Sequence, residues 1–244
     1  MNDQNAKQIK PLGRKAFGSI PHLPGSRMGP ADHSCHQGQE VICCEKPRDK
    51  HDRIIVTEKL DGSCMSLARQ GGQIIPLGRA GFRAGSSPYP HLREFEDFAK
   101  EINDSALAAL KDGERFVGEW MNVATGTKYR LNSKPFIIFG VMRGAEHLPW
   151  DYVQSAAEAA NLPTAKVLSD GPPVSIAEVL SKMGEYGFHG ALEIVEGAVW
   201  RVERRGAFDF HAKYVRHDKI DGKYLPGLHG NGPAYIFNDI EATA

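Results

Sequence analysis

The sequence lacks any long apolar run. None of its segments approaches the ~18 consecutive apolar residues that a membrane span requires. The first five residues, MNDQN, also lack the basic segment and following apolar segment of a secretory signal. We therefore expect a soluble, cytoplasmic protein without membrane contact. Its 244 residues, 41% of them hydrophobic, are enough to bury a sizeable core.

Cysteine is scarce, with four residues in the chain. Cys43 and Cys44 are adjacent, which is a poor arrangement for a bridge between them, so we expect reduced thiols. A short cluster contains zinc-ligand residue types without a Cys-x-x-Cys pair: His33, Cys35, His36, Cys43 and Cys44. The spacing favours ordinary loop residues over a zinc-dependent interaction site, and it leaves metal binding open.

The chain has no excess of charge of either sign, with 30 basic and 30 acidic side chains. This balance argues against binding of nucleic acid by the whole surface. Charge is nevertheless uneven, because seven Lys or Arg and four Asp or Glu lie between Trp200 and Lys223. Such an excess is usually a solvated face, but here it surrounds candidate site residues and predicts one basic face for phosphate contacts.

The most informative segment is residues 58–63, EKLDGS, which follows the apolar run 54–56. A lysine that ends a strand beside a tight turn can be held at the rim of a pocket, where its amine can act as a nucleophile. Because free lysine has a pKa near ~10.4, the site must remove a handicap of roughly 4 to 5 kcal/mol at neutral pH. Lys-x-Asp-Gly also occurs in ordinary surface turns, so Lys59 alone leaves both interpretations open.

Composition divides the chain into an irregular N-terminal arm (1–50) packed on the body, a body (51–225) and a C-terminal tail (226–244). The arm is rich in Gly, Pro and His and shows no sustained periodicity, so at most one short strand is expected there. The body shows no internal repeat, low-complexity tract or convincing linker.

Apolar alternation and turn residues predict a mostly antiparallel body. Strands are expected at 54–59, 64–69, 73–79, 115–120, 135–142, 191–195, 198–202 and 208–214. Helical spacing predicts an amphipathic helix over 92–110 and a second helix over 151–161. The capping box Ser175-x-x-Glu178 predicts a third helix that continues to about Tyr186.

Six sequence motifs, each unspecific when taken alone, follow one another in a fixed order. They are Lys59-x-Asp-Gly, Gly78-Arg79-Ala80-Gly81, Gly118-Glu119-Trp120, the strand with Phe139, the run EGAVWR at 196–201, and Lys213. In this order, over residues 54–216, the chain resembles the covalent nucleotidyltransferases and is most similar to the small phage-type, nick-sealing RNA ligases. The resemblance implies an α+β adenylation fold, with mostly antiparallel sheets flanked by helices.

The resemblance implies a catalytic set of Lys59, Asp61 and Lys213. Lys59 would attack the α-phosphate of ATP, expel pyrophosphate and form a lysyl-AMP intermediate. Asp61 would orient the amine, although a purely turn-forming role is equally compatible with its position. Lys213 would approach the α-phosphate from the opposite side and stabilise the charge of the transition state.

The resemblance also implies residues that bind the nucleotide. Arg79 would contact phosphate or the 3′ end, and Glu119 would accept a hydrogen bond from a ribose hydroxyl. Phe139 would stack on adenine, with Phe136 as the alternative. Glu58 would face the adenine edge. Outside the motif order, each of these residues has an ordinary structural interpretation.

Glu196 would bind Mg²⁺ or Mn²⁺, since Mg²⁺ prefers hard oxygen ligands and retains several waters. Arg201, at the end of the same motif, belongs to the nucleotide-binding set with Lys213. One departure concerns the second lysine that the family often places two residues after Lys213. This chain has Val215 there and Arg216 next, so Arg216 would take over phosphate contact.

The implied activity is ATP-dependent ligation of an RNA 5′-phosphate end to a 3′-hydroxyl end in nicked or structured RNA, a reaction of RNA repair. The alternatives are a minimal DNA ligase and a non-catalytic nucleotide or RNA-end binding module. The 28 residues after Arg216 are too few for the OB-fold domain of DNA ligases, which favours RNA. The natural RNA, protein partners and oligomeric state do not follow from the sequence.

Overall fold

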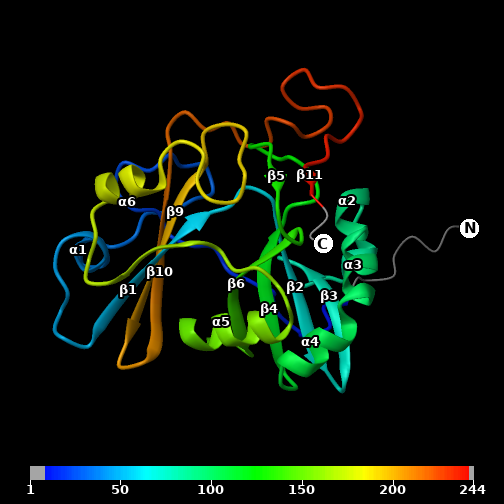
Figure 1. Cartoon of the computed structure of the whole chain (residues 1–244), viewed down its shortest axis with the longest axis horizontal. Helices are drawn as coiled ribbons and strands as arrows, with labels where there is room; N and C mark the ends of the chain where they lie inside the picture. Colours follow the sequence, from blue (N-terminus) through cyan, green and yellow to red (C-terminus); the bar gives the residue numbers. More distant parts are fainter. Residues whose placement is uncertain (1–8, 242–244) are drawn as a thin grey trace, which may run out of the picture.

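Two β-sheets stand side by side in the computed structural model, which describes residues 9–241 (Figure 1). The first sheet has the strand order β10-β9-β1-β8. All its neighbouring strands are antiparallel. Its strands are β1 (Asp52–Lys59), β8 (Val167–Gly171), β9 (Gly197–Arg204) and β10 (Ala207–Val215). The central strand β1 therefore ends at the candidate nucleophile.

The second sheet has the order β3-β2-β4-β6-β7 and is also antiparallel. Its strands are β2 (Ser63–Gln70), β3 (Gln73–Gly78), β4 (Glu114–Trp120), β6 (Phe136–Arg143) and β7 (Glu146–His147). A short parallel pair joins β5 (Arg130–Leu131) to β11 (Asp239–Ile240). The expected α+β arrangement of mostly antiparallel sheets is confirmed.

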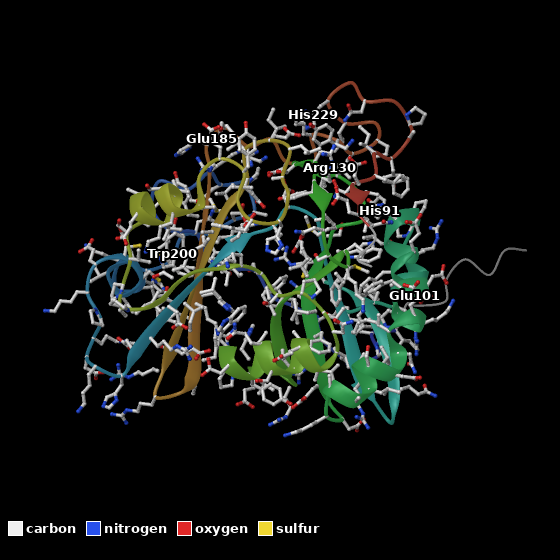
Figure 2. All side chains as sticks on the ribbon, viewed as in Figure 1. His91, Glu101, Arg130, Glu185, Trp200 and His229 are labelled. Atoms are coloured by element: carbon white, nitrogen blue, oxygen red, sulfur yellow. The ribbon has the colours of Figure 1, made fainter. Side chains whose placement is uncertain are left out.

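Strand alternation gives the first sheet an apolar outer face and an inner face that lines a cavity between the two sheets. Ile54 and Val56 pack with Trp200 on the outer face, against α1 (Gln37–Cys44) and α6 (Ile176–Met183). The Trp200 ring nitrogen donates to the carbonyl of Val174 at 3.1 Å, and Figure 2 shows this side chain beside α6.

Helices cover one face of the second sheet, where a large core contains Phe95, Phe116 and Trp150. The expected helix over 92–110 is three short helices, because the chain breaks between α2 (Pro90–Arg93), α3 (Phe95–Glu101) and α4 (Asn103–Ala109). The second expected helix is α5 (Trp150–Ala159). The predicted N-cap is confirmed, since the Ser175 side chain accepts from the Glu178 N–H, but α6 ends at Met183 rather than near Tyr186.

The strand expected at 191–195 is wrong. Its backbone bonds run to neighbouring loops, with Leu192 N–H donating to the Lys128 carbonyl and Val195 N–H to the Glu185 carbonyl. Gly184, Gly187 and Gly190 precede it with positive φ and turn the chain repeatedly, so the segment forms an isolated antiparallel bridge between Ala191 and Tyr129 instead of a strand. Apolar alternation here reflects packing of Val195 in a small core, not strand pairing.

The N-terminal arm is more ordered than its composition predicts. It contains α1, and residues 21–23 and 33–35 form bridge contacts beside β10. Residues 1–8 of the predicted arm and 242–244 of the predicted tail lie outside the described residues. A short 3₁₀ helix (Ala84–Ser86) precedes α2. Within residues 9–241, no helix is both long and apolar enough to cross a membrane.

The start of β1 is fixed by a buried carboxylate. The Asp52 side chain is fully buried and lies 2.8 Å from a nitrogen of Arg48 and 2.9 Å from one of Arg204. Burial alone would raise the pKa of Asp52, but hydrogen bonds from the two arginines outweigh it and lower the pKa to about 2. The charged form is therefore favoured by folding.

We expect Asp52→Asn to lower the free energy of unfolding by about 1 to 2 kcal/mol at pH 7. Because the pKa of Asp52 is depressed in the folded state, its contribution exists above the unfolded pKa and disappears as pH falls toward 2. Urea unfolding at pH 7 and pH 3 measures the change in the free energy of unfolding, with Asp218→Asn at an exposed position as the control. A destabilisation of equal size at both pH values would contradict the ion-pair explanation.

Candidate active site

All nine predicted site residues line one cavity of about 600 Å³ between the two sheets. Six of them lie on β1, β4, β6, β9 and β10, and the other three lie just after β1, just after β3 and just before β9: Glu58, Lys59, Asp61, Arg79, Glu119, Phe139, Glu196, Arg201 and Lys213. Residues more than 150 positions apart in sequence thus share one enclosed space. The structure brings the predicted set together, although it gives several members structural partners.

Cross-strand register explains why Lys213 and Lys59 face the same cavity. Lys213 pairs with Val199, and Val199 pairs with Thr57, which lies two residues before Lys59. Directly paired residues and residues two apart on a strand share a face of the sheet. Thr57 and Val199 also line the cavity, and the sequence analysis did not single out either of them.

Lys59 forms the central ion pair of the cavity. Its amine lies 2.6 Å from a carboxylate oxygen of Glu196, and the lysine side chain is 22% exposed. Burial lowers the pKa of Lys59, but the carboxylates of Glu196, Glu119 and Asp61 outweigh burial and raise it overall. In the nucleotide-free protein the amine is therefore protonated, and it becomes nucleophilic only when this negative charge is offset.

The cavity holds two carboxyl groups whose charged forms are disfavoured by burial. Burial raises the pKa of Glu119 to about 8, with Lys59 opposing the shift and Glu196 adding to it. Burial likewise raises the pKa of Glu196 to about 7 against the stabilising charge of Lys59. Two carboxyl groups compete for one ammonium, which is an environment that favours an additional cation.

Asp61 holds a loop rather than the amine. Its carboxylate accepts from the Thr125 hydroxyl at 2.6 Å, the Gly126 N–H at 3.2 Å and the Thr127 hydroxyl at 3.0 Å. The buried amine of Lys219 in turn donates to the Thr127 hydroxyl at 2.6 Å. These contacts favour the turn-forming alternative for Asp61. Neither threonine nor Lys219 carries a sequence signal of this role.

The glycine of Lys-x-Asp-Gly is required by close packing. A Cβ on Gly62 would stand 2.6 Å from the Trp120 carbonyl oxygen and 2.7 Å from the Met121 sulfur. The Gly62 N–H also donates to Glu119 at 3.2 Å. The turn after Lys59 thus docks directly on the end of β4, which fixes Glu119 relative to the lysine.

Glu58 borders the cavity, but strand alternation directs its side chain to the other side of β1 from Lys59, toward the loop at 187–188. One carboxylate oxygen accepts from the Phe188 N–H at 2.8 Å, and the other has no hydrogen-bond partner. Burial raises the pKa of Glu58 to about 7. These contacts favour a role in anchoring the loop at 187–188 over the predicted contact with a base edge.

Phe139 is the aromatic wall of the cavity on β6, and its side chain is only partly buried. The Phe17 ring of the arm packs edge-on against it, with centroids 5.2 Å apart. The alternative, Phe136, is fully buried among Phe95 and Phe98 in the helix-covered core. Of the two candidates, Phe139 alone presents a ring to the cavity.

Arg79 follows β3 directly at the cavity rim and is exposed. One guanidinium nitrogen donates to the Gly18 carbonyl at 3.0 Å. This bond attaches Arg79 to the arm. The other guanidinium nitrogens remain at the rim, where they can donate to a phosphate group.

Arg201 is buried at the inner end of the cavity. Its Nε donates to Glu203 at 2.7 Å, another nitrogen donates to the Leu148 carbonyl, and a third lies 3.5 Å from the His211 ring. Burial lowers the pKa of Arg201, and the Glu203 carboxylate opposes that shift. Arg201 therefore fixes the cavity floor and has little capacity left for phosphate.

The single basic face expected between Trp200 and Lys223 is wrong. Most of its cations serve internal contacts: Arg201 binds Glu203, Arg204 binds Asp49 and Asp52, Lys219 is buried, and Lys223 binds Glu193. Arg216 donates to the Gly184 carbonyl at 2.7 Å. Charge counted along the sequence did not distinguish paired cations from free ones.

A family model of RNA ligases matches residues 52–215, which is more than half of the chain and contains all nine predicted residues. The chain belongs to the RNA ligase family. A comparison with curated proteins gives no match. The family match confirms the resemblance inferred from the motif order.

Solved RNA ligases share the fold. A Naegleria gruberi RNA ligase with PPi is 20% identical, with a TM-score of 0.52, over 68% of this chain and 50% of that one. A mutant of that ligase with ATP and Mn is 17% identical, with a TM-score of 0.53, over 81% of this chain and 60% of the mutant. An apo mutant of the Naegleria gruberi ligase is 17% identical, with a TM-score of 0.54, over 82% of this chain and 61% of the mutant. The chain thus spans half to three fifths of the length of these RNA ligases.

We expect Asp61→Ala to reduce stability, because it leaves the Thr127 hydroxyl and the Gly126 N–H without this acceptor, at about 1 to 3 kcal/mol for each buried group, while the Thr125 hydroxyl keeps the Asp61 carbonyl. Thermal unfolding of the nucleotide-free protein measures the loss, with exposed Asp218→Ala as the matched control. Unchanged stability combined with impaired chemistry at Lys59 would instead assign Asp61 to orientation of the amine.

Proposed function

We propose that this chain is an ATP-dependent RNA ligase that adenylates itself on Lys59, transfers AMP to an RNA 5′-phosphate and seals it to a 3′-hydroxyl. The observation that carries the proposal is the Lys59 amine, 2.6 Å from Glu196 in a cavity lined by the full set of family motifs. Membership of the RNA ligase family supports the same reaction class.

The apolar, acidic and basic side chains of the cavity match the base, ribose and phosphates of ATP. Phe139 and Val199 offer apolar surfaces from opposite sheets for a flat base. Glu119 is a buried carboxyl for a ribose hydroxyl, and Lys213 and Arg79 supply positive charge for phosphates. Relatives of the same fold were solved with ATP and Mn and with AMP and Mn.

A divalent metal also fits this donor set. Burial raises the pKa of both Glu196 and Glu119, and a cation beside them would favour their charged forms. Within residues 9–241 no group of three or more His, Cys, Asp and Glu side chains is arranged as a metal site, and this includes the cluster in and before α1. Mg²⁺ would be held by Glu196 together with phosphates and water, the usual pattern for this ion. When bound, it supplies charge neutralisation at the phosphates.

In the first step the neutral Lys59 amine attacks the α-phosphorus of ATP. A nitrogen–phosphorus bond forms, the bond to the β-phosphate oxygen breaks, pyrophosphate leaves and the amine releases a proton. Lys213, on the same face of the sheet, stabilises the negative charge that develops on the α-phosphate. Asp61 and Gly62 keep the turn rigid during this step.

In the second step a 5′-phosphate oxygen of RNA attacks the adenylate phosphorus, and the bond to Lys59 breaks. In the third, a 3′-hydroxyl attacks the activated 5′-phosphate, loses its proton and releases AMP. Arg79 at the rim is the strand-end contact that this chain offers. A non-catalytic binding module would have no use for the buried amine, which favours an enzyme over that alternative.

We expect Lys59→Arg to abolish covalent labelling by α-³²P-ATP and Mg²⁺ on the denatured chain, because a guanidinium stays protonated and cannot form the bond. Lys50→Arg, at an exposed lysine outside the cavity, is the control and should label like the parent. Equal labelling of folded Lys59→Arg and parent protein would overturn the assignment of the nucleophile.

RNA and DNA ligation are distinguished by the terminal sugar. We expect pre-adenylated nicks with a ribonucleotide at the 3′-hydroxyl end to be sealed faster than nicks that end in a deoxyribonucleotide, because the 2′-hydroxyl is the group that tells RNA from DNA. Single-turnover sealing rates without ATP isolate this step. Equal or faster sealing of the all-DNA nick would favour the minimal DNA ligase.

A further inference from the structure

The N-terminal arm extends the first sheet at the point where Lys213 lies. β10 is the edge strand, and the arm pairs with it through Leu23 N–H to the Lys213 carbonyl at 2.8 Å and Lys213 N–H to the Pro21 carbonyl at 2.9 Å. Residues 33–35 then pair with His22 on its outer side. Lys213 is therefore held on both sides by strands, one of which is the arm.

The arm also presents a carboxylate to the Lys213 side chain. Asp32 Oδ1 lies 3.6 Å from the Lys213 amine. Asp32 Oδ2 accepts from the Gly29 N–H at 2.9 Å and lies 3.2 Å from the His22 ring nitrogen Nε2. His22 is 1% exposed, and its other ring nitrogen lies 2.6 Å from the Ser26 hydroxyl. The orientation of Asp32 is thus fixed by backbone and by a buried ring.

We propose, on the basis of the proposed function, that Asp32 is the positioning residue for Lys213, so that the arm supplies part of the adenylation site. The amine of Lys213 has three rotatable donors on a flexible stem and needs a fixed acceptor to point at a phosphate. Lys213 is the one lysine of β10, so no second amine from this strand can take its place.

Electrostatics supports this geometry. Burial and the nearby charge of Lys59 lower the pKa of Lys213, and Asp32 opposes that shift. The charged and titratable groups that face Lys213 are Lys59 and Glu196 on the same sheet, Arg79 on the second sheet, and Asp32 and His22 on the arm. Among these, Asp32 lies within ion-pair distance of the amine.

A double-mutant cycle separates positioning from general structural support. We expect Asp32→Asn to reduce kcat for adenylation about tenfold with a smaller change in KM for ATP, and Asp32→Glu to recover part of the loss. In a Lys213→Met background the same Asp32→Asn change should have less than a twofold effect. An equal effect in both backgrounds overturns the proposal, because a structural role does not need the Lys213 charge.

The matched control is Glu45→Gln, which removes one exposed acid from the same arm. Asparagine can still accept from Gly29, so Asp32→Asn retains the local turn, and thermal unfolding checks this. Adenylation of Asp32→Asn equal to that of Glu45→Gln would refute the positioning role. Absence of labelling in the parent protein would refute the proposed function instead.

A measurement without nucleotide tests the ion pair itself. Acetylation of Lys213 by acetic anhydride at pH 8, quantified by mass spectrometry against exposed Lys50 in the same sample, should become about threefold faster in Asp32→Asn, because loss of the carboxylate increases the neutral fraction of the amine. An unchanged ratio in a folded variant overturns the proposal, whatever the parent protein does with ATP.

Discussion

The pairing of the Lys59 ammonium with the Glu196 carboxylate is the constraint on which this site depends. A buried ammonium is costly unless carboxylates surround it, and buried carboxylates repel one another unless a cation separates them. Lys59 ends β1 and Glu196 immediately precedes β9, the neighbour of β1, so this ion pair belongs to the first sheet. Glu119 on β4 adds a carboxyl group from the second sheet, and its charge raises the pKa of Lys59.

Close backbone packing fixes the positions of the charged groups around Lys59. Gly62 docks on the end of β4, and a Cβ on Gly126 would stand 2.4 Å from an Asp61 oxygen. A Cβ on Gly197, which pairs with Lys59 across the sheet, would stand 1.9 Å from the Tyr214 carbonyl oxygen. Glycines thus lie where strands approach the lysine most closely, and larger residues would widen the cavity.

The sequence predicted what local pattern and motif order control. The β1 strand, the β2–β3 hairpin and the start of α6 follow from alternation, paired glycines and a capping serine. The convergence of nine residues on one cavity followed from the family's motif order, because spacing alone does not indicate which strands are neighbours. Burial was the main missing information: Arg201 and Lys219 look like surface cations in sequence but serve internal contacts.

The arm shows why composition was a poor guide there. Several of its backbone bonds go to distant parts of the chain, and these need no periodicity within the arm. The N–H groups of Ala16 and Phe17 donate to the Arg79 carbonyl on the second sheet, and six residues after Phe17 the N–H of Leu23 donates to Lys213 on the first. Because this one segment bonds to both rims of the cavity, it limits how far the sheets can separate. Entry of a nucleotide must therefore occur within the width that the arm sets, or by release of one of these two attachments.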